Sequence, residues 1–286
     1  MAIPFLPDDL NERTAVITGG GGVLCSCMAK AMAEAGVRVG VLDLRQDAAE
    51  AVAGEIRKAG GTAVAAECNV LERQSLEAAR ESVEAELGPC DILVNGAGGN
   101  HPKGTTSNEF LRPEDLKNKA EDLKTFFDLD PDGIQFVFNL NFLGTLLPTQ
   151  VFARGMAERG AGTVLNVSSM NAFCPLTKIP AYSGAKAAVS NFTQWLAVHF
   201  AKTGVRVNAL APGFFLTEQN RSLLTKEDGS LTPRGKTIIQ HTPMEKFGDP
   251  SDLLGALLWL LSDRASGFVT GTVIPVDGGF NAFSGV

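Results

Sequence analysis

The chain has 286 residues, of which 44% are hydrophobic and 20% are charged, as is typical of a globular protein with a large apolar core. Its formal net charge of −7 argues against nucleic acid or an anionic membrane surface as a partner. No apolar run approaches the roughly 20 residues that a membrane span needs, and the five cysteines include no C-x-x-C pair. The first residues also lack the pattern of a secretory signal, so we expect a reduced, cytoplasmic protein.

Short β-branched runs alternate with helical patterns along the chain. Strands are expected at 14–18, 37–43, 62–67, 91–95, 163–168, 205–210 and 272–276. Helices are expected at 22–35, 46–59, 72–87, 181–203 and 251–262. Apolar strands that alternate with helices predict a mainly parallel sheet with helices on both faces, a doubly wound Rossmann fold of the α/β class. No repeat or linker divides the sequence, so we expect a single domain over 1–286.

Two long segments interrupt this alternation, at about 99–133 and 214–248. Each follows the carboxyl end of an expected strand. Ligands bind at that edge in open α/β sheets. We therefore expect both segments to be insertions on the substrate side, although tolerated surface loops are the alternative.

A glycine-rich stretch, T-G-G-G-G-V-L-C at 18–25, lies between the first strand and the first helix. Gly19 permits a tight turn, and the four successive glycines suggest unobstructed backbone amides facing a pyrophosphate at the helix N-terminus. Asp43 ends the second strand, where a carboxylate accepts hydrogen bonds from a ribose diol and repels a 2′-phosphate. The pattern predicts NAD rather than NADP, with Arg45 as the opposing indication.

The strongest group of residues for chemistry is Ser169, Tyr182 and Lys186. Tyr182 and Lys186 are four residues apart on an expected helix and therefore project from one face. A lysine cation beside a phenol is expected to lower the pKa of the phenol, as a general base requires. Tyr182 is the only tyrosine in the chain. A lone Y-x-x-x-K is usually a solvated helix pair, but the serine and the glycine turn favour a catalytic site.

These motifs resemble the short-chain dehydrogenase/reductase family from Thr14 to Gly279, together with N-G-A-G at 95–98, N-F-L-G at 141–144, P-G at 212–213 and V-D-G-G at 276–279. The resemblance implies that Tyr182 is the acid/base, that Ser169 steadies the substrate oxygen, and that Lys186 also holds the nicotinamide ribose. It implies that Asn141 completes a proton relay through water. The cofactor contacts that we expect from the glycine turn, Asp43 and this resemblance are Gly19, Gly21, Gly22, Val23, Leu24, Asp43, Asn69, Val70, Asn95, Ala97, Gly98, Tyr182, Lys186, Pro212, Gly213, Phe215 and Thr217. Members usually form tetramers, so a homotetramer is expected.

The chain departs from the family pattern T-G-x-x-x-G-x-G at two positions of the turn. Val23 and Cys25 stand where the second and third glycines belong, and Gly22 comes one position early. Asn69 stands where the family usually has an aspartate near the adenine. We expect cofactor binding to persist with a different path of the turn and with Cys25 enlarging the contact between helix and strand.

The turn, the stretch G-G-N-H-P-K-G-T-T at 98–106 and the acidic segment to Asp132 resemble one branch of the family, the D-mannonate oxidoreductases or fructuronate reductases. That resemblance implies interconversion of D-mannonate and D-fructuronate with NAD. Hydroxyl, amide and cationic groups suit a sugar acid, and the candidate substrate contacts are Asn100, His101, Lys103, Asn171 and Lys178. The alternative for each of these is an ordinary loop residue.

Two other functions are considered. Another member of the family would act on gluconate-type or 3-oxoacyl substrates, and the polar segment at 98–106 suits an acyl chain poorly. A binding protein that senses a dinucleotide without chemistry would not need the serine, tyrosine and lysine together. No group of His, Cys, Asp and Glu has metal-ligand spacing, so no catalytic metal is expected.

Overall fold

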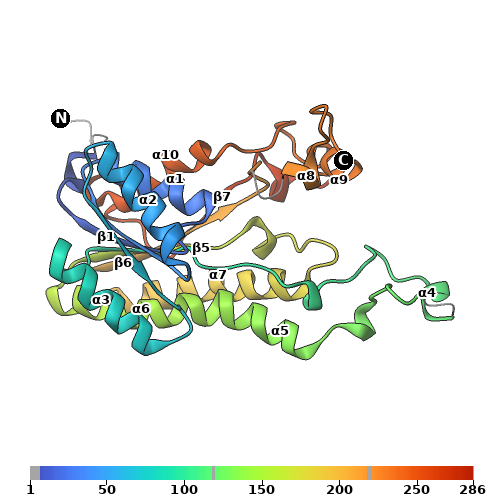
Figure 1. Ribbon diagram of the computed structural model, residues 1–286, viewed down its shortest axis with the longest axis horizontal. Coiled ribbons are helices and arrows are strands. Elements are labelled where there is room, and N and C mark those ends of the chain that lie inside the picture. The colour runs from blue at the N-terminus through green and yellow to red at the C-terminus, as the bar shows by residue number, and fades with distance from the viewer. Residues whose placement is uncertain (1–6, 118–119, 218–220, 286) are drawn as a thin grey trace.

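The computed structural model describes residues 7–117, 120–217 and 221–285. Within these residues the strands form one parallel sheet in the order β3-β2-β1-β4-β5-β6-β7 (Figure 1). The strands are β1 Thr14–Thr18, β2 Arg38–Asp43, β3 Ala63–Glu67, β4 Ile92–Asn95, β5 Gly162–Val167, β6 Val205–Pro212 and β7 Val273–Val276. Every predicted strand is present within two residues at each end, and the parallel pairing confirms the predicted fold class.

Helices cover both faces of the sheet (Figure 1). One face packs against α1 Val23–Glu34, α2 Gln46–Lys58 and α10 Leu254–Leu261. The other packs against α3 Arg73–Leu87, α6 Gly144–Arg159 and α7 Pro180–Phe200. Because β1 and β4 are buried along their whole length, their sequences are nearly continuous apolar runs rather than alternating ones, whereas the equally buried β6 includes Arg206 and Asn208.

The register of the central strands brings the predicted site residues to one edge. Thr18 pairs with Asn95, and Asn95 pairs with Asn166. This register places three segments at the same edge of the sheet: the glycine turn, the N-G-A-G segment and the segment that begins at Ser169. This is the carboxyl edge, where ligands bind in such folds.

One long helical segment, 131–159, was not among the predicted helices. It consists of α5 Pro131–Phe138, a π-helical turn at Asn139–Leu143, and α6. Its length and composition would suffice to cross a membrane, but half of its most apolar stretch is buried, and it packs against α3 and α7 as a core helix does. Two local features obscure the helix in the sequence, since Pro148 lies inside α6 and the π-helical turn shifts the helical spacing.

The two predicted insertions leave the carboxyl edge in the structure as well. The described part of 99–133 includes α4 Pro113–Lys117, which projects far from the sheet at the right of Figure 1. The described part of 214–248 includes α8 Arg221–Leu224 and α9 Pro233–Gln240. Residues 118–119 and 218–220 of these insertions, and residues 1–6 and 286 of the chain, lie outside the described residues. The division of the chain into one domain with two insertions stays a prediction.

Candidate active site

The glycine turn is shaped by the strands beside it. Gly19 has a φ of +63°, and a Cβ at that position would lie 2.9 Å from the Cα of Ala97. A Cβ at Gly20 would lie 2.6 Å from the side chain of Val41. Both positions therefore require glycine, one for its left-handed backbone and both for close packing.

The free amides of this turn are not those predicted from the four glycines. The amide of Gly20 donates to the Leu42 carbonyl, that of Gly21 to Asp43 Oδ2 at 3.0 Å, and that of Gly22 to the Gly19 carbonyl. The tight turn thus closes on itself and on the end of β2. Gly22 caps α1 without a side-chain hydrogen bond, and within the described structure the amides of Val23 and Leu24 lack a protein acceptor.

Asp43 occupies the predicted position at the end of β2. Its Oδ2 accepts the Gly21 amide, and its Oδ1 accepts the amide of Arg45 at 3.1 Å. A carboxylate offers about four acceptor positions. The Asp43 carboxylate therefore holds the turn in place and retains acceptor capacity for a diol.

Cys25 replaces a family glycine, and the space that its side chain needs comes from Gly96. Cys25 is buried, and a Cβ added to Gly96 would collide with the Cys25 sulfur. Burial raises the pKa of the Cys25 thiol to about 12, so the thiol is neutral near pH 7. The thiol side chain enlarges the contact between α1 and the end of β4, as the sequence predicted.

Asn95 and Asn69 use their side chains within the protein. The Asn95 Nδ2 donates to Thr149 Oγ1 at 2.9 Å and to Asn166 Oδ1 at 2.8 Å, so it braces the sheet against α6. Asn69 Nδ2 donates to Glu72 Oε1, and its Oδ1 accepts the amide of Leu71. A cofactor contact of Asn69, or of Asn95 through its Nδ2, would therefore compete with internal hydrogen bonds, whereas the buried Oδ1 of Asn95 has no partner among the described residues. The neighbouring Val70 is buried and lies close to Gly144.

Ser169 and Tyr182 meet beyond the end of β5. Ser169 begins a short 3₁₀ turn, where its Oγ accepts the amide of Asn171 at 3.2 Å. Its hydroxyl is also hydrogen-bonded to the phenol of Tyr182, which lowers the pKa of the phenol. The larger influence is removal of the phenol from water, so the pKa of Tyr182 is raised above its usual value. The prediction of a lowered pKa for Tyr182 is therefore wrong: burial outweighs the hydrogen bond with Ser169, and no effect of Lys186 accompanies it.

Lys186 lies beneath the ring of Tyr182. Its Nζ is 5.7 Å from the ring centroid and donates to the carbonyl of Val167 at 2.7 Å. Burial lowers the pKa of Lys186 to about 8. Lys186 therefore stays charged only up to mildly alkaline pH, which fits a group that exchanges protons.

Asn141 lies in the π-helical turn and reaches the segment that follows β4. Its Nδ2 donates to the carbonyls of Gly99 and Val137, and its Oδ1 accepts the Gly99 amide at 3.3 Å. A Cβ on Gly98 would lie 2.7 Å from Asn141 Oδ1 and 3.1 Å from Lys186 Nζ. Gly98, Asn141 and Lys186 therefore converge, although they are far apart in the sequence.

Four cofactor contacts were predicted at the end of β6 and in the residues that follow it. Pro212 ends β6, and Gly213 lies close against the backbone of Asp277. Phe215 is buried and packs against Gly248. Thr217 is the last described residue before 218–220. Together these residues hold the start of the second insertion against the end of the sheet.

The predicted substrate residues of the first insertion mainly bind one another. Lys103 Nζ forms an ion pair with Asp130 Oδ2 at 3.0 Å, and this ion pair raises the pKa of Lys103. Asn100 Nδ2 donates to Thr105 Oγ1, and His101 Nδ1 accepts the amide of Lys103. The ammonium of Lys103 is thus paired with Asp130, 27 residues later, and its role as a substrate contact stays a prediction.

Asn171 and Lys178 lie on the segment between β5 and α7. Asn171 is buried, and its Oδ1 has no hydrogen-bond partner in the described structure. Lys178 has a φ of +71°, which is unfavourable for a residue with a side chain. Its carbonyl accepts the amide of Thr106 at 2.9 Å, which ties this segment to the first insertion.

A cleft of about 390 Å³ lies beside this segment. Both insertions contribute to its walls, as do the residues before α7 and the ring of Phe280. Two of its basic residues, Arg234 and His241, were not predicted as site residues. Nothing in the local sequence signals them, because they reach the site only through the fold of the second insertion.

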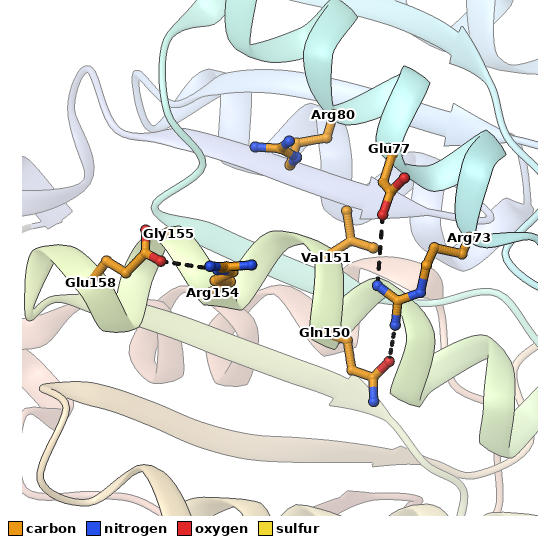
Figure 2. Close-up of a pocket in the computed structure, with 8 residues that line it drawn as sticks. All are labelled: Arg73, Glu77, Arg80, Gln150, Val151, Arg154, Gly155 and Glu158. Atoms are coloured by element: carbon orange, nitrogen blue, oxygen red, sulfur yellow. Dashed lines mark hydrogen bonds and ion pairs between the residues drawn. The ribbon is translucent and has the colours of Figure 1, made fainter.

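A second hollow of about 310 Å³ lies between α3 and α6 (Figure 2). Each of its arginines has a partner: Arg73 lies against Glu77 and Gln150, Arg154 against Glu158, and Arg80 against Glu84 outside the hollow. It contains none of the predicted site residues. Among the described residues, no group of three His, Cys, Asp or Glu side chains is placed to hold a metal ion.

Comparison with known proteins places this geometry in a family. Residues 13–228 match the model of the short chain dehydrogenases. An uncharacterised oxidoreductase from Haemophilus influenzae is 55% identical over 278 residues, which cover 97% of this chain and 96% of the relative. A crystal structure from the same species, of a protein suggested to be a D-mannonate oxidoreductase and holding bound NAD, is 55% identical with a TM-score of 0.91. The match covers 97% of this chain and 98% of that one.

More distant relatives differ in their substrates. A 7alpha-hydroxysteroid dehydrogenase from Escherichia coli is 32% identical, with 94% of each chain covered. A 2-dehydro-3-deoxy-D-gluconate 5-dehydrogenase from Formosa agariphila is 34% identical, with 97% of this chain and 96% of the relative covered. The shared framework thus accommodates different substrates. From its fold, its site geometry and these matches, the chain belongs to the short-chain dehydrogenase/reductase family of oxidoreductases.

Proposed function

We propose that this protein is an NAD-dependent oxidoreductase that interconverts a secondary alcohol and a ketone of a sugar acid, with D-mannonate and D-fructuronate as the substrate pair. The observation that carries the proposal is the meeting of Ser169, Tyr182 and Lys186 at the carboxyl edge of the sheet. A cleft lined by basic residues also lies beside this edge, although the protein as a whole is acidic.

The glycine turn fits a dinucleotide. The space over Gly22 is open, since a Cβ added there would approach only the Gly19 carbonyl. Within the described structure, the amides of Val23 and Leu24 have no hydrogen-bond acceptor. A helix N-terminus of this kind attracts phosphate. Asp43 favours NAD over NADP, and the bound NAD of the Haemophilus structure supports the same choice. When bound, the nicotinamide accepts or supplies the hydride.

The residues of the chain handle the proton and the orientation of the substrate. Tyr182 would take the proton of the substrate hydroxyl or return it to the ketone, and Ser169 would hydrogen-bond the same oxygen. Lys186, with its pKa near 8, would exchange that proton further toward Asn141 and solvent. The raised pKa of Tyr182 keeps the phenol protonated at neutral pH, which favours its role as an acid in the direction of ketone reduction.

The relatives support a sugar acid as the substrate, through the suggested D-mannonate activity of the Haemophilus protein and the Formosa enzyme that acts on a deoxygluconate. A gluconate-type or 3-oxoacyl substrate is the alternative within the family. A non-catalytic dinucleotide sensor is the alternative outside it, and it gives no account of the paired Ser169 and Tyr182. A homotetramer and a cytoplasmic location stay predictions.

The test is the oxidation of NADH by the purified protein with D-fructuronate. We expect rapid turnover with NADH and little with NADPH, because the Asp43 carboxylate repels a 2′-phosphate. A preference for NADPH would contradict the role of Asp43. Turnover of 5-keto-D-gluconate but not of D-fructuronate would replace the substrate while leaving the reaction class in place.

A further inference from the structure

The cleft of about 390 Å³ beside α7 has an excess of positive charge. The side chains of Lys178, Arg234 and His241 line it, and Glu109 is its one acidic residue in the described chain. The protein as a whole carries a net charge of −7, so this local excess runs against the overall composition. A basic cleft in an acidic protein is suited to select a small anion.

The two cations of the cleft, Lys178 and Arg234, differ from Lys103 in having no ion-pair partner in the described chain. Within the described residues, neither the guanidinium of Arg234 nor the ammonium of Lys178 lies within ion-pair distance of a carboxylate. His241 Nδ1 lies 2.8 Å from the carbonyl of Thr237, which leaves Nε2 as the available ring nitrogen. Lys103, by contrast, already forms an ion pair with Asp130.

The cleft also adjoins the reacting residues. Lys178 and Ile179 line it and immediately precede α7, which carries Tyr182 in its first turn. Phe214, which follows the Pro212–Gly213 pair, lines another wall. A molecule whose alcohol carbon lies at Tyr182 would therefore extend the rest of its length into this cleft.

The strained backbone of Lys178 further indicates that this wall of the cleft is held in a fixed conformation. Its φ of +71° is costly for a lysine, and the hydrogen bond from the Thr106 amide to its carbonyl holds it there. Such strain persists where the surroundings fix the position of a side chain. Arg234 lies in the first turn of α9, a helix capped by Thr232, so the opposite wall is also anchored.

We propose that this cleft binds the carboxylate of the substrate, with Arg234 as the main anchor and Lys178 as a second cation. The inference rests on the proposed function, since it concerns the same site and gives it a determinant of specificity. An arginine is suited to hold a carboxylate through two parallel hydrogen bonds. Arg234 would thus select acids over neutral sugars without touching the reacting carbon.

The experiment compares the full-length variants R234M, R234K and K236M with the wild type. Lys236 is exposed on the same helix but does not line the cleft, so K236M is the matched control. In R234M the KM for D-fructuronate should rise roughly ten- to one-hundredfold, the loss expected for a charge-assisted hydrogen bond. The kcat and the affinity for NADH should change little. R234K should recover part of the loss, and K236M should match the wild type.

Calorimetric binding of D-mannonate to the NADH-saturated protein gives a measurement that needs no turnover. If the wild type binds D-mannonate more tightly than R234M does but shows no turnover, the proposed function is wrong and the role of Arg234 in binding the carboxylate stands. Turnover with an unchanged KM in R234M would overturn the anchor and leave the function in place. Failure of D-mannonate to bind the wild type would overturn the anchor as well.

Discussion

The proposed catalytic residues and the first insertion are built in contrasting ways. Ser169 and Lys186 are buried, and Tyr182 is partly buried on a helix of 21 residues that packs against the sheet. The first insertion instead projects from the carboxyl edge and exposes large apolar side chains: Phe110, Leu111, Leu116, Phe126 and Phe127. Chemistry that requires fixed geometry is therefore carried by the packed framework, whereas the insertions vary the surroundings.

The contrast extends to charge. On the framework, burial shifts the pKa of Lys186 down to about 8 and that of Tyr182 upward. On the insertion, Lys103 and Asp130 are solvated and neutralise each other. Substitutions in the framework should consequently have large effects on rate and on pH dependence, and those in the first insertion small ones.

The largest effect is expected for Tyr182→Phe. Loss of the phenolic hydroxyl removes the proton donor and acceptor, so kcat should fall about 10²- to 10⁴-fold. The affinity for NADH, measured by fluorescence titration, should stay within a few-fold of the wild type. Turnover near the wild-type rate would remove the proposed mechanism and with it the contrast between the two regions.

A smaller effect, on stability, is expected for Lys186→Met. The folded pKa of Lys186, about 8, lies below the ordinary 10.5, so between these values the unfolded chain binds more protons. The free energy of unfolding of the wild type should therefore rise relative to the variant as pH increases from 8 to 10.5, by on the order of 3 kcal/mol. Below pH 8 the difference should be constant.

Urea unfolding at pH 7, 8.5 and 10 measures this difference. Groups far from Lys186 titrate alike in both proteins and cancel when the two curves are subtracted, whereas Cys25, which interacts with Lys186, does not. If the free energies of unfolding of the two proteins change in parallel with pH, Lys186 is not desolvated as described. The framework and the first insertion would then differ less in the effect of burial on their charged groups.

The smallest effect is expected for Lys103→Ala. The side chain is 57% exposed, and its partner Asp130 is also partly exposed, so their ion pair contributes little to stability. The KM for D-fructuronate and the midpoint of thermal unfolding should both stay at the wild-type values. A KM that rises as much as in R234M would restore Lys103 as a substrate contact and make the first insertion part of the recognition site.

Much of the framework could be predicted from local pattern. Apolar runs and glycine stops located all seven described strands, and the spacing of Ser169, Tyr182 and Lys186 singled out the proposed catalytic group. The segment 131–159 escaped prediction because Pro148 lies inside α6 and the π-helical turn around Asn141 shifts the helical spacing.

The sequence by itself determined the order of the elements, the parallel sheet and the residues at its carboxyl edge, because hydrophobic periodicity and turn residues act over a few positions. Only the tertiary structure decided which amides of the glycine turn stay free, since Asp43 and Leu42 approach from β2. It also decided that Gly96 makes room for Cys25 and that burial sets the pKa of Tyr182. These outcomes depend on contacts between distant segments, which no local pattern encodes.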